Sequence, residues 1–171
     1  LAFAWFELVY PAPDDPERLA WAVAGYWLVN FAAVLLFGYE PWARRGECFS
    51  VFFRMVSRLS LFELGDDRRL RLGLPGAKLS GAEPLPVGGV VFLLLVLGSV
   101  SFDGLMRTFA WLGAIGINPL EFPGRSAVTE VNTVGLVALP VGLAAAFFLA
   151  VGLGGRLAGA DVSTARTAGV L

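Results

Sequence analysis

Long apolar stretches without a single charged residue recur along this sequence. The three longest cover residues 19–39, 84–102 and 131–155. A helix rises ~1.5 Å per residue and the hydrocarbon layer of a bilayer is ~30 Å thick, so ~20 apolar residues suffice to cross it. None of the three stretches carries the polar stripe of a helix that lies on the surface of a soluble protein. The pattern therefore predicts membrane-spanning helices.

The start of one helix and the number of segments can be predicted from the sequence. The segment that begins near residue 17 follows Asp15 and Pro16, which favour a helix start. Residues 1–10 are also apolar but would span only ~15 Å as a helix. We expect this first segment to be the end of a crossing that begins upstream. The predicted fold class is all-α, a polytopic transmembrane helical bundle of about four segments, the first truncated. These segments are expected at about 1–10, 17–39, 87–112 and 128–153, within one helical domain over 1–157.

The third segment allows two interpretations, because the apolar stretch from Val87 to Ile117 exceeds a simple span and contains Asp103 and Arg107. One long helix could run to about Trp111. Alternatively, a helix ends near residues 101–104 and a second, short helix covers 105–117. We prefer the second interpretation, because glycines weaken a long helix.

Composition agrees with a membrane location. Hydrophobic residues make up 57% of the 171 residues and the mean hydropathy is +0.71, whereas only 16% of the residues are charged. An ordinary soluble domain has about 25% charged residues. The formal net charge of −1 gives no support for a nucleic-acid partner. The partner that composition predicts is the lipid bilayer.

The basic residues are unevenly distributed. Lys and Arg are enriched in short loops that stay in the cytoplasm, so segment 40–86 is predicted to be cytoplasmic and the breaks at 11–16 and 118–127 to face outward. Eight of the thirteen basic residues lie in segment 40–86: Arg44, Arg45, Arg54, Arg58, Arg68, Arg69, Arg71 and Lys78.

Within segment 40–86, residues 47–64 show apolar residues at helical spacing. This pattern predicts an amphipathic helix that lies on the membrane, with a docking surface for a partner protein as the alternative. Residues 69–72 alternate like a short strand. Residues 158–171 read as a tail that leads to a further C-terminal part of the parent chain.

Several polar residues of the predicted topology approach the outer membrane boundary. Ionisable groups near a span tend to face protein or water and to mark pathways or sites. Asp103 and Arg107 are four residues apart and can pair on one helix face; the pair is either a surface salt bridge or part of a site in which a second carboxylate joins Asp103. Asn30 lies in mid-span, where it either hydrogen-bonds a neighbouring helix or belongs to the polar site. The candidate residues are Glu7, Asn30, Asp103, Arg107, Glu121, Arg125 and Glu130.

The fourth segment has small residues at four-residue spacing. They predict a smooth face for close helix packing, either within the protein or in a homo-oligomer. Expected partners are therefore the remaining helices of the parent chain or another membrane protein. The residues of this face are Ala138, Gly142, Ala146 and Ala150.

The sequence contains no histidine. A Ser-His-Asp triad and a His-ligated metal cannot be completed within these residues. A phosphate-cradling glycine motif with a following Lys is also missing from the sequence. We expect no metal site and no cofactor, and catalytic residues cannot be assigned.

Four motifs of the sequence stand out: WFELVYP at 5–11, RGECFSVFFR at 45–54, SFDGLMRTF at 101–109 and NPLEFPGRS at 118–126. With these motifs the chain resembles a group of bacterial polytopic inner-membrane proteins often labelled fenitrothion hydrolase. The resemblance covers most of residues 1–157 and implies a bacterial inner-membrane location and a longer parent chain.

Three functions remain as hypotheses. The small-residue face and the outer polar residues favour a transporter-like protein or a subunit of a membrane complex. The resemblance alone implies a membrane-bound hydrolase of apolar phosphotriesters. The third hypothesis is a scaffold subunit without chemistry of its own, so enzyme activity stays open.

Overall fold

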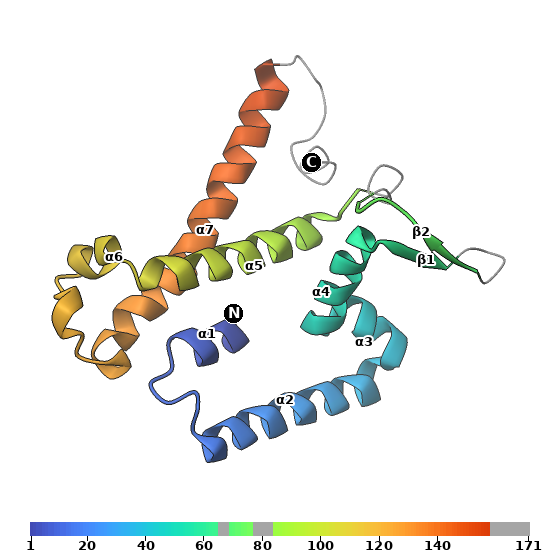
Figure 1. Cartoon of the computed structure of the whole chain (residues 1–171). Helices are drawn as coiled ribbons and strands as arrows, with labels where there is room; N and C mark the ends of the chain where they lie inside the picture. The colour runs from blue at the N-terminus through green and yellow to red at the C-terminus, as the bar shows by residue number, and fades with distance from the viewer. Residues whose placement is uncertain (65–68, 77–83, 158–171) are drawn as a thin grey trace. The chain divides into compact units, whose positions relative to one another are not determined.

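The computed structural model describes residues 1–64, 69–76 and 84–157, and most of them are helical (Figure 1). The all-α prediction is confirmed, with the addition of one short β-hairpin. In chain order, the described α-helices are α1 (Ala2–Leu8), α2 (Pro16–Phe37), α3 (Tyr39–Arg45), α4 (Cys48–Val56), α5 (Val87–Met106), α6 (Phe109–Ala114) and α7 (Arg125–Leu157). Two 3-10 turns, η1 (Ser57–Leu59) and η3 (Pro119–Glu121), and two strands, β1 (Phe62–Leu64) and β2 (Leu70–Leu72), complete the described elements.

Three helices are long and apolar enough to cross a membrane. They are α2 with 22 residues, α5 with 20 and α7 with 33. Large apolar side chains on them are exposed, among them Leu36, Val100 and Leu149. Exposed apolar surface of this extent is compatible with a membrane location, where lipid replaces water.

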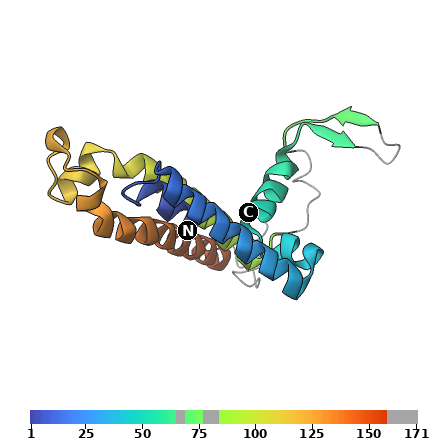
Figure 2. The ribbon, with the colours of Figure 1, turned by 90° about the horizontal axis from the view of Figure 1, so that it is seen from below.

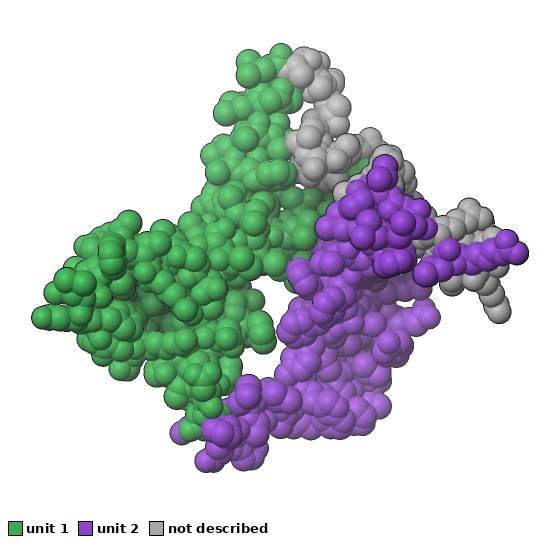
Figure 3. All heavy atoms as spheres, in the orientation of Figure 1, with its two compact units in different colours: residues 1–15, 84–171 green, residues 16–83 purple. Residues whose placement is uncertain are grey.

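The chain forms two compact units, which Figure 3 colours separately. The first unit joins residues 1–15 to the chain from residue 84 onward, and the second holds residues 16–83. The single helical domain predicted over 1–157 is thus described as two units.

The core of the first unit lies where α5 and α7 cross (Figures 1 and 2). Phe102 and Met106 of α5 are buried there with Leu136 of α7 and with Val9, which follows α1. Two glycines permit the approach of the helices. A Cβ on Gly98 would lie 2.6 Å from the Cα of Pro140, and a Cβ on Gly135 would lie 2.4 Å from the Phe102 ring. Small residues at both contact points therefore set how closely α5 and α7 pack.

In the second unit, the chain reverses direction at the end of α2. Gly38 has φ of 83°, a conformation that L side chains rarely adopt, so this turn favours glycine. After the turn, the Trp42 ring of α3 stacks on Phe37 with 6.2 Å between ring centroids, and the Trp42 indole N–H donates to Asn30 Oδ1 at 2.8 Å. Helix α3 thus packs back against the C-terminal half of α2 (Figure 1).

The amphipathic helix is shorter than predicted. Helix α4 ends at Val56, and η1 follows, so the expected helix over 47–64 is wrong in its C-terminal part. There the backbone pairs as an antiparallel hairpin in which Phe62 lies opposite Leu72 and Leu64 opposite Leu70. The strand predicted from alternation at 69–72 is confirmed as β2. Its partner β1 alternates in the same way over Phe62–Leu64, but these residues were assigned to the predicted amphipathic helix.

The third predicted segment consists of two helices, but the break is not at residues 101–104. Helix α5 continues through Gly104 to Met106, and α6 begins after Thr108. The Thr108 Oγ1 accepts a hydrogen bond from the backbone N–H of Trp111 at 3.2 Å. A threonine cap, and not the glycine, therefore separates the helices. The predicted fourth segment, 128–153, extends to Arg125–Leu157 as α7, and the predicted tail at 158–171 lies outside the described residues.

Candidate functional site

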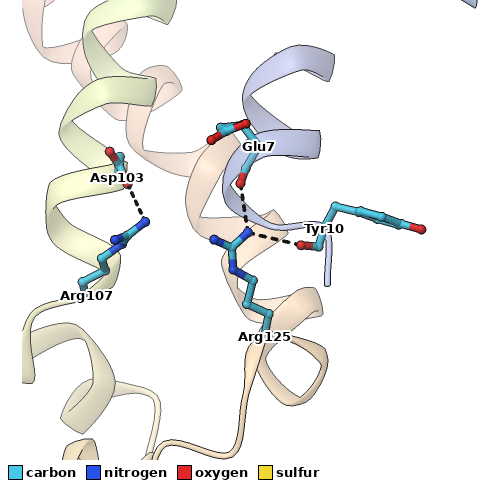
Figure 4. A network of polar contacts seen from close by, with 5 residues as sticks. All are labelled: Glu7, Tyr10, Asp103, Arg107 and Arg125. Atoms are coloured by element: carbon cyan, nitrogen blue, oxygen red, sulfur yellow. Dashed lines mark hydrogen bonds and ion pairs between the residues drawn. The ribbon is translucent and has the colours of Figure 1, made fainter. Parts of the chain in front are cut away.

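Most of the predicted polar residues belong to the first unit, near the end of α5 and the start of α7 (Figure 4). Arg107 pairs with Asp103 at 3.7 Å between Nη2 and Oδ1, at helical i, i+4 spacing. The Arg107 side chain is 68% exposed and Asp103 46%. An exposed pair of this kind contributes little to stability, so both groups remain accessible to a solute.

Arg125, at the first position of α7, ties down the loop after α1. Its Nη1 donates to the carbonyl of Glu7 at 3.0 Å and to the carbonyl of Tyr10 at 3.4 Å (Figure 4). Glu7 thus contributes its backbone oxygen to this contact, and its side chain is exposed. Both acceptors are neutral backbone carbonyls, and no carboxylate is paired with the guanidinium in these two contacts. The positive charge of Arg125 is therefore not neutralised by them.

Two indole N–H groups hold the start of α7 in place. Trp5 of α1 donates to Thr133 Oγ1 at 2.9 Å, and Trp111 of α6 donates to Asn132 Oδ1 at 3.0 Å. Asn132 is only 8% exposed and is the buried polar residue of the described chain. A buried amide with a fixed acceptor bond has a defined orientation, so Asn132 is preorganised.

These elements line an open pocket of about 360 Å³ within the first unit. Two guanidinium groups and one amide supply its polar lining, and the other lining side chains are apolar. Planar guanidinium groups recognise carboxylates and phosphates, and mainly apolar walls with a few polar groups are typical of small-molecule sites. The arrangement suits a small anion with an apolar body. The lining residues are Leu8, Met106, Arg107, Leu112, Phe122, Arg125 and Asn132.

The structure brings together only some of the predicted site residues. Arg107 and Arg125 line the pocket, and Asp103 reaches it through its ion pair with Arg107. Glu121 and Glu130 are exposed and are not among the lining residues. Asn30 belongs to the second unit, where its amide donates to the Tyr26 carbonyl at 2.9 Å and accepts from Trp42.

The two indole anchors were not predicted. Trp5 and Trp111 lie near the ends of apolar segments, a position that is equally typical of rings at the membrane interface.

Among the described residues, no group of three or more His, Cys, Asp or Glu side chains could hold a metal ion.

The small-residue face of α7 is exposed in the described part of the chain. Helix α5 packs beside it on Gly135, Leu136 and Pro140, so the face itself has no described helix against it. Its predicted role in helix packing or homo-oligomer formation stays a prediction. The face consists of Ala138, Gly142, Ala146 and Ala150.

Comparison of the chain with protein-family models, curated proteins and solved structures gives no match. The resemblance to proteins labelled fenitrothion hydrolase, and the hydrolase activity that it implies, stay predictions.

Proposed function

We propose that this chain belongs to a transporter-like integral membrane protein whose first unit binds a small organic anion. The observation that carries the proposal is the convergence of Arg107, Arg125 and Asn132 on one pocket with otherwise apolar walls. Two cationic side chains beside membrane-spanning helices cost free energy, and such groups commonly mark a substrate pathway.

The position of Arg125 supports a fixed cation in the pocket. Its Nη1 contacts the carbonyls of Glu7, in the last turn of α1, and of Tyr10, and the guanidinium also lines the pocket. A guanidinium has five N–H donors, so those on Nε and Nη2 remain for an anion while Nη1 holds the carbonyls. An anion can therefore bind Arg125 without displacing the contact that positions it.

The orientation that we propose follows the distribution of positive charge. Segment 40–86 lies on the cytoplasmic side of a bacterial inner membrane, because it holds most of the basic residues. The pocket, at the other end of α5, opens toward the outer side, so the anion would be captured from outside the cell.

The test is benzoate binding and uptake by the full-length protein. Benzoate has a carboxylate for the guanidinium groups and a ring for the apolar walls. Arg107→Gln should weaken benzoate binding ~10–100-fold, because a hydrogen bond to a charged group contributes ~1.5–3 kcal/mol. Titration calorimetry in nanodiscs measures binding, and [14C]benzoate influx into proteoliposomes measures transport.

Glu130→Gln is the matched control, because Glu130 is an exposed charged residue of α7 outside the pocket lining. It should leave benzoate binding unchanged. The proposal fails if wild-type protein neither binds nor transports benzoate or the smaller organic anion acetate. It also fails if Arg107→Gln and Glu130→Gln bind with equal affinity.

A further inference from the structure

The second unit contains a helical hairpin that returns along α2. Beyond the Gly38 turn, Trp42 contacts Phe37 and Asn30, and farther along the chain Glu47 accepts a hydrogen bond from the Tyr26 hydroxyl. Later residues thus meet earlier positions of α2, as in an antiparallel pair. The tip of the hairpin, at Gly46 and Glu47, lies beside Tyr26.

Close packing at the tip fixes this return path. A Cβ on Gly46 would lie 2.2 Å from the Trp42 ring, so only glycine fits without movement of the indole. The Phe49 ring meets Tyr26 edge-on with 5.8 Å between centroids. Helix α4 then leads away from α2 (Figures 1 and 2). The hairpin of α3 and α4 is therefore anchored on α2 at Asn30 and at Tyr26.

Tyr26 is the eleventh of the 22 residues of α2. The helix is ~33 Å long, so Tyr26 lies ~16 Å from its C-terminal end. The half of α2 beyond Tyr26 exposes Phe31, Leu35 and Leu36, which are large apolar side chains that need lipid around them. When this half lies in the bilayer, the tip of the hairpin lies near mid-depth.

Charged groups surround the tip. Arg44 pairs with Glu40 at 3.4 Å on the exposed side of α3, and the Arg54 guanidinium donates to the Arg44 carbonyl. The Glu47 carboxylate accepts hydrogen bonds from the Tyr26 hydroxyl and from the backbone N–H groups of Phe49 and Ser50. Charged side chains and non-helical backbone are tolerated at membrane depth only where protein or water surrounds them.

We propose that residues 38–56 form a re-entrant hairpin, and that its tip lines a water-filled vestibule that reaches from the basic side of the membrane to the level of Tyr26. The solutes that could enter are water and small hydrated cations, because the carboxylate of Glu47 lies at the end of the vestibule. The anion pocket belongs to the other unit and plays no part here.

Cys48 is the only cysteine of the sequence and lies directly after the tip, on the exposed surface. It serves as a reporter of depth and of water access in the full-length protein in vesicles. Depth is measured by quenching of a bimane on Cys48 with nitroxide lipids. Water access is measured by the rate of reaction with a charged, membrane-impermeant methanethiosulfonate.

Two reference sites are placed in a Cys48→Ser background. Leu28→Cys reports an exposed position of α2 near the level of Tyr26, and Tyr39→Cys, at the start of α3, reports the level of the turn after α2. Burial and the neighbouring Glu47 carboxylate raise the pKa of the Cys48 thiol, so all reactions are run at pH 8.5 to provide enough thiolate.

The bimane on Cys48 should show the depth of Leu28→Cys, and Cys48 should react with the charged reagent at least tenfold faster than Leu28→Cys. A depth equal to that of Tyr39→Cys would show that the hairpin is not re-entrant. Reaction as slow as that of Leu28→Cys would show that the tip is dry. Either result overturns the proposal.

Discussion

The Glu47 carboxylate accepts hydrogen bonds from three neighbours, namely the Tyr26 hydroxyl and the backbone N–H groups of Phe49 and Ser50. Each bond favours the charged form. A carboxyl whose pKa is lower in the folded than in the unfolded protein stabilises the fold above its ordinary pKa, here 4.5. This contribution is lost as the pH falls from about 4.5 toward the folded value.

A titration of Glu47 tests this arrangement. Followed by the 13Cδ resonance of labelled glutamate, its midpoint should lie near pH 2 in place of 4.5. Tyr26→Phe removes one donor and should raise the midpoint, because the charged form loses a hydrogen bond. A midpoint that is the same in wild type and Tyr26→Phe would contradict the contact between α2 and the tip of the hairpin.

Individual polar residues could be predicted from the sequence only as candidates. Arg107 and Arg125 are conspicuous because charges are rare beside apolar stretches, and the structure places both in one pocket. The partners of these residues could not be predicted. Arg125 binds two backbone carbonyls more than a hundred residues away in the sequence, and such contacts depend on tertiary packing.

Helix α7 offers a matched pair of glycines that separates packing from helix propensity. A Cβ on Gly135 would lie 2.4 Å from the Phe102 ring, whereas a Cβ on Gly142 would meet nothing within 4 Å. Gly135→Ala should destabilise the protein by about 1–3 kcal/mol through overpacking. Gly142→Ala should be neutral or stabilising by up to about 1 kcal/mol, since Ala favours a helix.

Thermal unfolding in detergent micelles, followed by circular dichroism, measures both variants against the wild type. Equal midpoints for Gly135→Ala and Gly142→Ala would contradict the close crossing of α5 and α7. Lower midpoints for both would instead indicate that the exposed small-residue face is covered in the intact protein.

The elements themselves were largely predictable, because their apolar length is fixed by the bilayer. The start of α2 at Pro16 and of α5 at Val87 follow local signals in the sequence. The break after α5 was misplaced, because Gly104 weakens a helix less than the Thr108 cap favours a new one. The partners of each helix were not predictable, since side chains that face lipid are as apolar as those that face protein.

The side of the membrane on which each loop lies depends on how many helices cross the bilayer. Helix α5 is one apolar helix of 20 residues, preceded by the β-hairpin and followed by α6 and η3. If it crosses the bilayer once, the residues before and after it must lie on opposite sides. Leu74 and Leu120 are suitable reporters, because both are highly exposed, at 78% and 86%.

In a Cys48→Ser background, Leu120→Cys should react with a charged thiol reagent in intact bacterial cells, whereas Leu74→Cys should react only after the inner membrane is permeabilised. The direction follows from the basic residues, which cost most to move across the membrane and hold segment 40–86 inside. Reaction of both positions from the same side would mean that α5 does not cross. The reverse order would mean that α5 crosses but that the positive charge does not set its orientation, and the anion pocket would then open toward the cytoplasm.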